Sequence, residues 1–350
     1  MKFKKISLLI VLSMLLLSSF TSFAGADDLD VVEKQLNQRI LKLKSYDLNK
    51  LKNLGFSDEQ IKFLSDKEIK DILTNNYKSI GCSEKQTYLV LYKSFDNSSK
   101  RSFSSQNENG EVYSAMIPLT KEEKRDYLKN KKLFVSDIVK NIKRLDKIKD
   151  INTYKIIDGK KEEIDLDSFV SRKSSGSSTE ENMDWGVLEF GINAYDMSTS
   201  TKIKKKLGMD FAWTDSPGTL GTDAMALSHT GLNVGITDCY DDGAYMKYYY
   251  GNEWRDGNKY IDSDPEGNGL SAEIDLRTGR CYGRAYVVIG NTKKNVDEDN
   301  YFFMVAKFAH AIKGYRLNPC IGVGSVSFSP STSTKIVESD TLKINSIKTY

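Results

Sequence analysis

The stretch Leu207-Gly-Met-Asp-Phe-Ala-Trp213 sets the class of fold open to this chain. Its large apolar residues stand at every second position, separated by glycine, aspartate and alanine. Because side chains on a strand point alternately to the two faces of a sheet, this spacing predicts a strand with one buried face. The same alternation places on one parity Phe302, Met304, Phe308, His310 and Ile312.

Short strands recur through the rest of the C-terminal half. Turn residues separate them, as at Asp241-Asp-Gly243 and Gly267-Asn-Gly269, and no helical pattern connects them. Strands joined in this way form antiparallel sheets, so we predict an antiparallel β-sandwich-like domain over 182–350, with a barrel as the alternative. A parallel α/β sheet is disfavoured. The further predicted strands are 185–195, 223–229, 244–250, 270–276, 284–289, 321–328 and 334–337.

The N-terminal part has a helical pattern instead. Apolar residues between 32 and 43 recur at three- and four-residue steps, and capping boxes at Ser57 and Ser65 each predict a further short helix. Residues 87–95 and 111–118 surround a polar loop and predict a β-hairpin. The chain as a whole is therefore predicted to be α+β, a small helical and mixed N-terminal region followed by the β-domain.

A serine-rich segment separates these two parts. Residues 171–181 read Ser-Arg-Lys-Ser-Ser-Gly-Ser-Ser-Thr-Glu-Glu and offer almost nothing to bury. We predict a linker there, with the helical and mixed region over 27–170. The β-domain over 182–350 is expected to fold independently of it.

The N-terminus has the layout of a secretion signal over residues 1–26. Three lysines precede the apolar run Ile6–Leu17, and Ala24-Gly-Ala26 supplies small residues for cleavage. That run is too short to span a bilayer and no comparable run follows, so we expect a secreted, extracellular protein with no transmembrane segment in the mature chain. Without the signal, 51 Lys+Arg fall to 48, equal to the 48 Asp+Glu, and this balance argues against nucleic acid as a partner.

A set of short motifs runs through the C-terminal half. They are Phe211-Ala-Trp213 followed by Pro217 and Thr222-Asp223, Gly269 to Leu276, Ala309-His310, and the serine-rich Gly324 to Ser329. With these motifs, roughly Trp185 to Asp340 resembles a group of uncharacterised secreted proteins of Gram-positive bacteria. Gly55 to Leu73 is similar to a helical segment of such exported proteins. The resemblance implies an extracellular β-rich domain, and it brings no activity, substrate or catalytic residue with it.

Secretion allows disulfides, and the chain has four cysteines, Cys82, Cys239, Cys281 and Cys320. Three pairings are open. Cys239 and Cys281 lie near the ends of predicted strands, so we take them as the candidate disulfide, which would leave the other two to link the regions or stay free. The sequence has no Cys-x-x-Cys pair and therefore no zinc or redox motif.

The sequence offers few starting points for catalysis. Its two histidines, His229 and His310, fall in register with apolar strand residues, which favours packed side chains over catalytic bases. An extracellular hydrolase that uses His310 stays as one alternative function. No catalytic residue is predicted.

One acidic loop is similar to a calcium-binding loop. Carboxylates stand at several of the ligand positions, but proline and glycine occupy two others and strands flank the loop, so we interpret it as a polar turn. No metal and no cofactor are predicted. The acidic residues of this loop are Asp262, Asp264, Glu266 and Glu273.

Aromatic residues crowd the stretch 240–260, which includes Tyr245, Tyr249 and Trp254. Such rings on an exposed sheet face can stack on sugar rings or on a partner protein, although tyrosine is also an ordinary strand residue. We predict a non-catalytic extracellular or cell-surface binding module that uses these three side chains, with a glycan or protein ligand.

The main alternative is a membrane-active secreted toxin or bacteriocin-like protein. The Ser/Thr-rich stretch 323–337 alternates Val326 and Phe328 with serines, as a membrane-inserting hairpin does. Two strands of about 10 alternating residues would be needed to cross a bilayer, and Pro330 interrupts this stretch.

Overall fold

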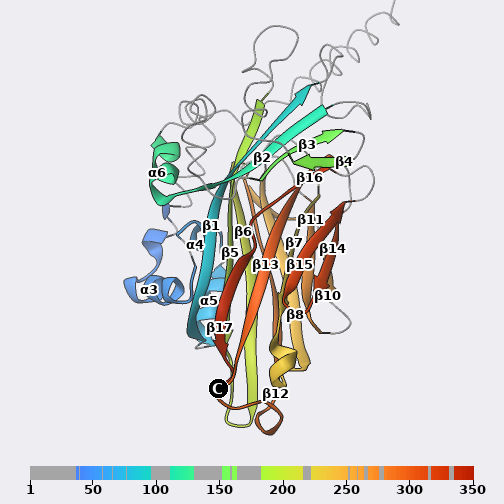
Figure 1. Ribbon diagram of the computed structural model, residues 1–350. Helices are drawn as coiled ribbons and strands as arrows, with labels where there is room; N and C mark the ends of the chain where they lie inside the picture. Colours follow the sequence, from blue (N-terminus) through green and yellow to red (C-terminus); the bar gives the residue numbers. More distant parts are fainter. Residues whose placement is uncertain are drawn as a thin grey trace, which may run out of the picture. The chain divides into compact units, whose positions relative to one another are not determined.

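The computed structural model divides into two compact units, Met1–Leu48 and Asn49–Tyr350, and every sheet belongs to the second unit (Figure 1). Helices α3 (Ser45–Asn53), α4 (Asp58–Phe63), α5 (Asp66–Thr74) and α6 (Lys121–Lys129) precede or interrupt the strands. The structure describes residues 37–38, 40–56, 58–64, 66–75, 77–95, 111–129, 152–157, 160–163, 183–215, 222–250, 253–257, 259–263, 267–275, 280–313, 317–330 and 335–350.

The largest sheet, sheet A, has nine strands in the order β4-β3-β2-β1-β5-β6-β12-β8-β9. All of its neighbouring strands are antiparallel. Its strands are β1 (Lys78–Phe95), β2 (Glu111–Leu119), β3 (Asn152–Ile157), β4 (Lys160–Glu163), β5 (Met183–Asp196), β6 (Lys202–Asp215), β8 (Asp238–Tyr250), β9 (Glu253–Asp256) and β12 (Cys281–Thr292).

Sheet B has the strand order β10-β11-β7-β13-β16 (Figure 1). The edge of β13 that faces away from β7 pairs with two strands, with β17 along residues 301–306 and with β16 along residues 309–313. These pairs are also antiparallel, so the predicted antiparallel β class is confirmed. Its strands are β7 (Thr222–His229), β10 (Lys259–Ser263), β11 (Gly269–Asp275), β13 (Tyr301–Lys313), β16 (Lys335–Glu338) and β17 (Leu342–Lys348). Two short 3₁₀ helices, η1 (Gly231–Val234) and η2 (Lys293–Asn295), lie between strands.

The predicted hairpin 87–95/111–118 is present as β1 and β2, with Leu89 opposite Ile117. The other edge of β1 pairs with β5, where Leu89 lies opposite Val187. Sheet A therefore continues from the strands before the serine-rich segment to those after it. The segment 171–181 itself lies outside the described residues, as does the predicted signal.

The helices begin where local capping allows. α4 and α5 start at Asp58 and Asp66, one residue after the serines of the two predicted capping boxes, although those serines lie outside the described residues. A capping box that the sequence analysis missed opens α6. There the amide of Glu123 donates to Thr120 Oγ1 at 3.2 Å, and the amide of Thr120 donates to Glu123 Oε2 at 3.0 Å.

The stretch predicted as a single strand over 321–328 is instead a hairpin. β14 (Leu317–Gly322) turns at Gly324 into β15 (Ser325–Pro330), and these strands form a separate two-stranded sheet. Gly324 has φ 66°, a left-handed conformation that glycine adopts without strain. Val326 and Phe328 are buried in a cluster with small residues of β7 and β13, namely Ala224, Ala226, Ala309 and Ala311.

Apolar side chains of sheets A and B share the main core. Phe308 of β13 contacts three rings of sheet A, with centroid distances of 5.7 Å to Phe190, 5.5 Å to Phe211 and 6.2 Å to Trp213. Of these four rings, Phe211, Trp213 and Phe308 belong to the alternating stretches that predicted buried faces. Burial of such rings is the largest favourable contribution to a β fold of this kind.

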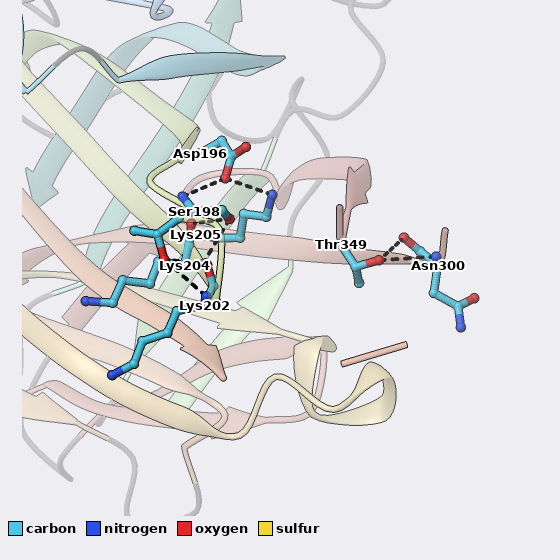
Figure 2. Close-up of polar contacts among 8 residues, drawn as sticks. Asp196, Ser198, Lys202, Lys204, Lys205, Asn300 and Thr349 are labelled. Carbon is cyan, nitrogen blue, oxygen red and sulfur yellow. Dashed lines mark hydrogen bonds and ion pairs between the residues drawn. The ribbon is translucent and has the colours of Figure 1, made fainter. Parts of the chain in front are cut away.

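Polar contacts hold the turn between β5 and β6 (Figure 2). Asp196 Oδ1 accepts hydrogen bonds from the Ser198 amide at 3.0 Å and from Lys205 Nζ at 3.1 Å. Burial acts to raise the pKa of Asp196, but these donors outweigh it and the pKa is lowered. Elsewhere, Thr349 Oγ1 accepts from the Asn300 amide at 3.2 Å, which ties the end of the chain to the start of β13 (Figure 2).

Candidate functional site

The three predicted binding residues lie on the face of sheet A that points away from the main core. On β8 the neighbouring residues Met246 and Tyr248 pack against the core. Tyr245 and Tyr249 have the opposite parity, so they point to the other face. The pairing of β8 with β9 sets Trp254 directly opposite Tyr249, which brings all three predicted residues to one end of this face.

A fourth ring, Tyr282 of β12, joins the three into one group, which we call the aromatic cluster (Tyr245, Tyr249, Trp254 and Tyr282). The rings meet edge to face, with centroid distances of 5.3 Å for Tyr249–Trp254, 5.4 Å for Trp254–Tyr282 and 6.2 Å for Tyr245–Tyr282. Tyr282 is buried and the other three are half-exposed. Edge-to-face packing holds the four rings together while leaving part of Tyr245, Tyr249 and Trp254 open to solvent.

Sequence reasoning missed Tyr282 because the strand was predicted to begin at Arg284. The structure begins β12 at Cys281, and Tyr282, Arg284 and Tyr286 then stand at every second position on the outer face. The alternation of these three residues was the sequence signal from which the position of Tyr282 could have been predicted. Other tyrosines of the aromatic stretch lie elsewhere, with Tyr260 63% exposed on β10 of sheet B.

One charged pair lies on the same face as the aromatic cluster. Lys247 of β8 lies opposite Asp256 of β9, and Lys247 Nζ is 3.9 Å from Asp256 Oδ1. Asp256 is exposed and Lys247 is half-buried, so the pair contributes little to stability. It supplies one hydrogen-bond donor group and one acceptor group beside the aromatic rings. Glu253 and Arg255, whose side chains lie 2.6 Å apart, have the opposite parity to Trp254 and point to the other face.

A buried polar group lies beside the aromatic cluster on the same face, and we call it the Arg284 network (Arg284, Asp210, Asn193 and Tyr195). Arg284 Nε lies 3.6 Å from Asp210 Oδ1, and Nη2 donates to Asn193 Oδ1 at 3.4 Å and to Tyr195 Oη at 3.3 Å. The amide of Asn193 also donates to Asp210. The four side chains satisfy one another in a region closed to water.

The electrostatics of the network follow from this pairing. Burial acts to lower the pKa of Arg284, but the facing Asp210 carboxylate outweighs it, so the pKa is raised and the guanidinium stays charged. Burial likewise raises the pKa of the Tyr195 hydroxyl, which stays neutral. The network therefore carries one fixed cation beside one carboxylate.

His310 is buried between the sheets and makes an ionisable pair with Asp223. His310 Nδ1 lies 2.7 Å from Asp223 Oδ1, and Trp213 Nε1 donates to Asp223 Oδ2 at 2.9 Å. The side chains of both His310 and Asp223 are 0% exposed. His229 is also buried, and its Nδ1 accepts the amide of Gly231 at 3.1 Å.

The predicted Cys239–Cys281 disulfide is not formed. Cys281 lies opposite Tyr248 on β8, whereas Cys239 lies opposite Ile289, eight positions further along β12. At about 3.3 Å per strand residue this separation is far beyond the reach of a disulfide. Both are free thiols, as is Cys320, and the side chain of Cys82 lies outside the described residues.

Among the described residues, no group of three or more His, Cys, Asp or Glu side chains could hold a metal ion. Asp262 of the acidic loop is exposed on β10, and two of the loop's carboxylates lie outside the described ranges. In the same part of the chain no helix is long and apolar enough to span a membrane.

Comparison with known proteins adds little to this geometry. No protein-family model and no curated protein matches the sequence. Among solved structures, a chain described as "Pore forming protein" is matched with a TM-score of 0.20 and 9% identity, over 48% of this chain and 89% of that one. A TM-score of that size supports no inference about fold or activity.

Proposed function

We propose that this protein is a non-catalytic extracellular binding module whose ligand packs on the aromatic cluster. On this proposal sheets A and B form a sandwich-like scaffold, and the sequence-based expectation of secretion places it outside the cell. The fold holds the rings at one end of sheet A, an arrangement that suits a surface that binds a ligand without catalysing a reaction.

The observation that carries the proposal is the gathering of four rings from three strands on one outer face. Rings from β8, β9 and β12 meet within 5.3–6.2 Å although up to 37 residues separate them in sequence. Tyrosine and tryptophan lose little conformational entropy when a ligand covers them, so clusters of this kind are efficient contact surfaces.

A glycan is the ligand that this surface suits best. The flat apolar faces of sugar rings stack on tyrosine and tryptophan rings, while the hydroxyl groups need donors and acceptors at the rim. Lys247 provides a donor and Asp256 an acceptor on the same face as the cluster.

The placement of the histidines also supports a non-catalytic role. His229 and His310 are the only histidines of the chain, and both are closed to solvent. A general base must come within hydrogen-bond reach of its substrate, which a fully buried imidazole does not do without opening the core.

Sedimentation with purified peptidoglycan tests the proposal. We expect the mature protein to cosediment and the double variant Tyr249→Ala/Trp254→Ala to lose at least ~10-fold in affinity, as truncation of central aromatic contacts usually does. The matched control is Tyr260→Ala/Tyr301→Ala, which removes two rings that are 63% and 57% exposed on sheet B.

Equal binding by wild type and by the Tyr249→Ala/Trp254→Ala variant would show that the aromatic cluster is not the binding site. Dye release from liposomes without any glycan binding would instead favour the membrane-active alternative. Release of products from glycan, peptide or ester substrates, abolished by His310→Ala in a variant that still folds, would favour the hydrolase.

A further inference from the structure

Three lysines of β6 point to the outer face of sheet A, the face that also carries the aromatic cluster. Lys202, Lys204 and Lys206 alternate with Ile203 and Leu207, which lie in the main core. Because side chains alternate along a strand, the three lysines share the face that points away from the core. Successive members stand two residues, or about 6.6 Å, apart along the strand, so they form a regular row of cations.

The lysine between two of them points the other way and is paired. The Lys205 side chain is 3% exposed, and its Nζ lies 3.1 Å from Asp196 Oδ1. Lys202 and Lys204 instead extend away from Asp196 (Figure 2). Among the residues that the structure describes, no carboxylate lies within ion-pair distance of the Lys202 or Lys204 ammonium group. β6 therefore pairs its buried lysine with a carboxylate and leaves two outer lysines without one.

Both of these outer lysines lie over the ring of Tyr240, which belongs to β8. Lys204 Nζ is 4.4 Å and Lys202 Nζ is 5.3 Å from the centroid of this ring. The ring lies against β12 at Gly290, where a Cβ would come within 3.0 Å of it. Each ammonium group has a favourable contact with the ring, but the two cations repel each other. An anion bound between them would relieve that repulsion.

A second tyrosine repeats this arrangement further along the sheet. Tyr286 of β12 lies directly opposite Gly243 of β8, where a Cβ would come within 2.9 Å of the Tyr286 ring. Lys206 Nζ is 3.6 Å from the centroid of that ring. We call the five side chains the lysine–tyrosine row (Lys202, Lys204, Lys206, Tyr240 and Tyr286).

Two carboxylates border the row on its other side. Tyr240 Oη donates to Asp238 Oδ2, and Tyr286 Oη donates to Asp241 Oδ2, both at 3.4 Å. The two aspartates belong to β8, and β12 separates that strand from the lysines of β6. The surface thus has cations along β6 and carboxylates along β8. An anionic ligand would bind on the β6 side, where the ammonium groups are.

We propose that the lysine–tyrosine row binds the phosphate groups of a phosphodiester-linked glycan polymer. This inference rests on the proposed glycan-binding function and specifies the charge of the ligand. A lysine ammonium group is a compact charge with three donors and binds phosphate as a point charge, whereas planar recognition of a carboxylate favours arginine. The regular spacing of the three lysines suits an anion that repeats along a chain, and the tyrosine rings offer apolar surface for the sugars between the phosphates.

Cosedimentation with two forms of one bacterial cell wall tests the proposal. The intact walls carry phosphodiester-linked polymers, and the stripped walls have lost them through treatment with hydrofluoric acid. We expect the wild-type protein to bind intact walls about 10-fold more tightly at low salt, since two exposed charge contacts contribute roughly threefold each. Added salt should shrink this difference, because it screens exposed charges.

The variant Lys202→Gln/Lys204→Gln should abolish the difference between intact and stripped walls. Lys202 is exposed and Lys204 half-exposed, so the variant is expected to fold as the wild type does. The matched control is Lys259→Gln/Lys343→Gln, which removes two exposed lysines of sheet B. Lys343 also lies over an aromatic ring, with its Nζ 4.2 Å from the centroid of Phe303. This control should keep the full difference.

Three results would overturn the inference. The first is equal binding of the wild-type protein to intact and stripped walls, and the second is a difference that survives in Lys202→Gln/Lys204→Gln. The third is binding to phosphatidylglycerol vesicles as tight as to intact walls and lost in the same variant, which would assign the row to a lipid surface. Failure of the proposed function looks different, because the wild-type protein would then not bind stripped walls at all.

Discussion

Replacement of His310 by alanine should destabilise the protein strongly, and the reason lies in its partner. The imidazole is fully buried with Nδ1 at 2.7 Å from Asp223 Oδ1, and the Trp213 indole lies 5.0 Å from the imidazole, centroid to centroid. His310→Ala removes the ring, opens a cavity beside Trp213 and leaves the fully buried Asp223 carboxylate with fewer partners.

The magnitude follows from these two losses. Removing the hydrogen-bond partner of a buried carboxylate costs ~3–5 kcal/mol, and a large-to-alanine truncation in a core costs ~2–5 kcal/mol. The two overlap because the same atoms are removed, so we expect about 4 kcal/mol at pH 8. That is a large share of the ~5–15 kcal/mol by which folded domains are stable.

Asp223 makes part of this loss dependent on pH. Burial raises the pKa of Asp223 above its ordinary value, and the contacts with His310 and Trp213 only partly oppose this. A carboxyl whose folded-state pKa is raised contributes stability that is complete below its unfolded pKa of about 3.9 and is lost as pH rises through the folded pKa. The nearby Cys281 thiol, whose pKa burial also raises, stays neutral throughout.

The assay is urea denaturation of wild type, His310→Ala and Asp223→Asn/His310→Ala, followed by far-ultraviolet circular dichroism at pH 8 and pH 5. At pH 8 the double variant should recover part of the lost stability, because its amide needs no counter-charge. The gap between the two variants should narrow as the pH is lowered to 5, because the raised pKa of the buried Asp223 favours its protonated form in His310→Ala. A loss below ~1 kcal/mol, or a gap that does not change with pH, would refute the reasoning.

Three further outcomes follow from the sheet. Proteolytic cleavage within residues 171–180 should leave the two fragments together until denaturant is added, since β1 pairs with β5, and separation on native gel filtration would contradict this pairing. Arg284→Met should cost ~3–5 kcal/mol in urea titrations by removing the cationic partner of the buried Asp210 carboxylate, and adding Asp210→Asn should restore most of it; no restoration would count against the pair. Gly269→Ala should unfold the protein or lower its melting temperature by many degrees, because a Cβ there meets the Leu227 carbonyl oxygen, and an unchanged melting curve would contradict that contact.

Local periodicity predicted the strands well because it records which face of each strand is buried. The alternation at 207–213 and 302–312 predicted the buried faces of β6 and β13, and both supply the main core. The same rule failed at 321–328, where the turn at Gly324 breaks one expected strand into β14 and β15. A glycine in a short polar stretch has no periodic signature, so the hairpin was read as a continuous strand.

The candidate site was predicted only in part, because the sequence of one strand does not show which residues of a neighbouring strand lie opposite it. Tyr245, Tyr249 and Trp254 were identified by their crowding along the chain, and they do lie together. Tyr282 comes from a distant segment and joins them through the pairing of β12 with β8. The same pairing separates Cys239 from Cys281, which proximity to strand ends had suggested as a disulfide.

The sequence by itself determined the antiparallel β class, the buried parity of Trp213 and His310 and the aromatic richness of β8, because these depend on spacing within one segment. Only the tertiary structure decided which segments meet. It joined β1 to β5 across the serine-rich segment, brought Asp223 to His310, and set Phe56 over Arg284. Such contacts depend on the packing of whole sheets, where the free energy of burying one face selects among registers that local patterns leave equal.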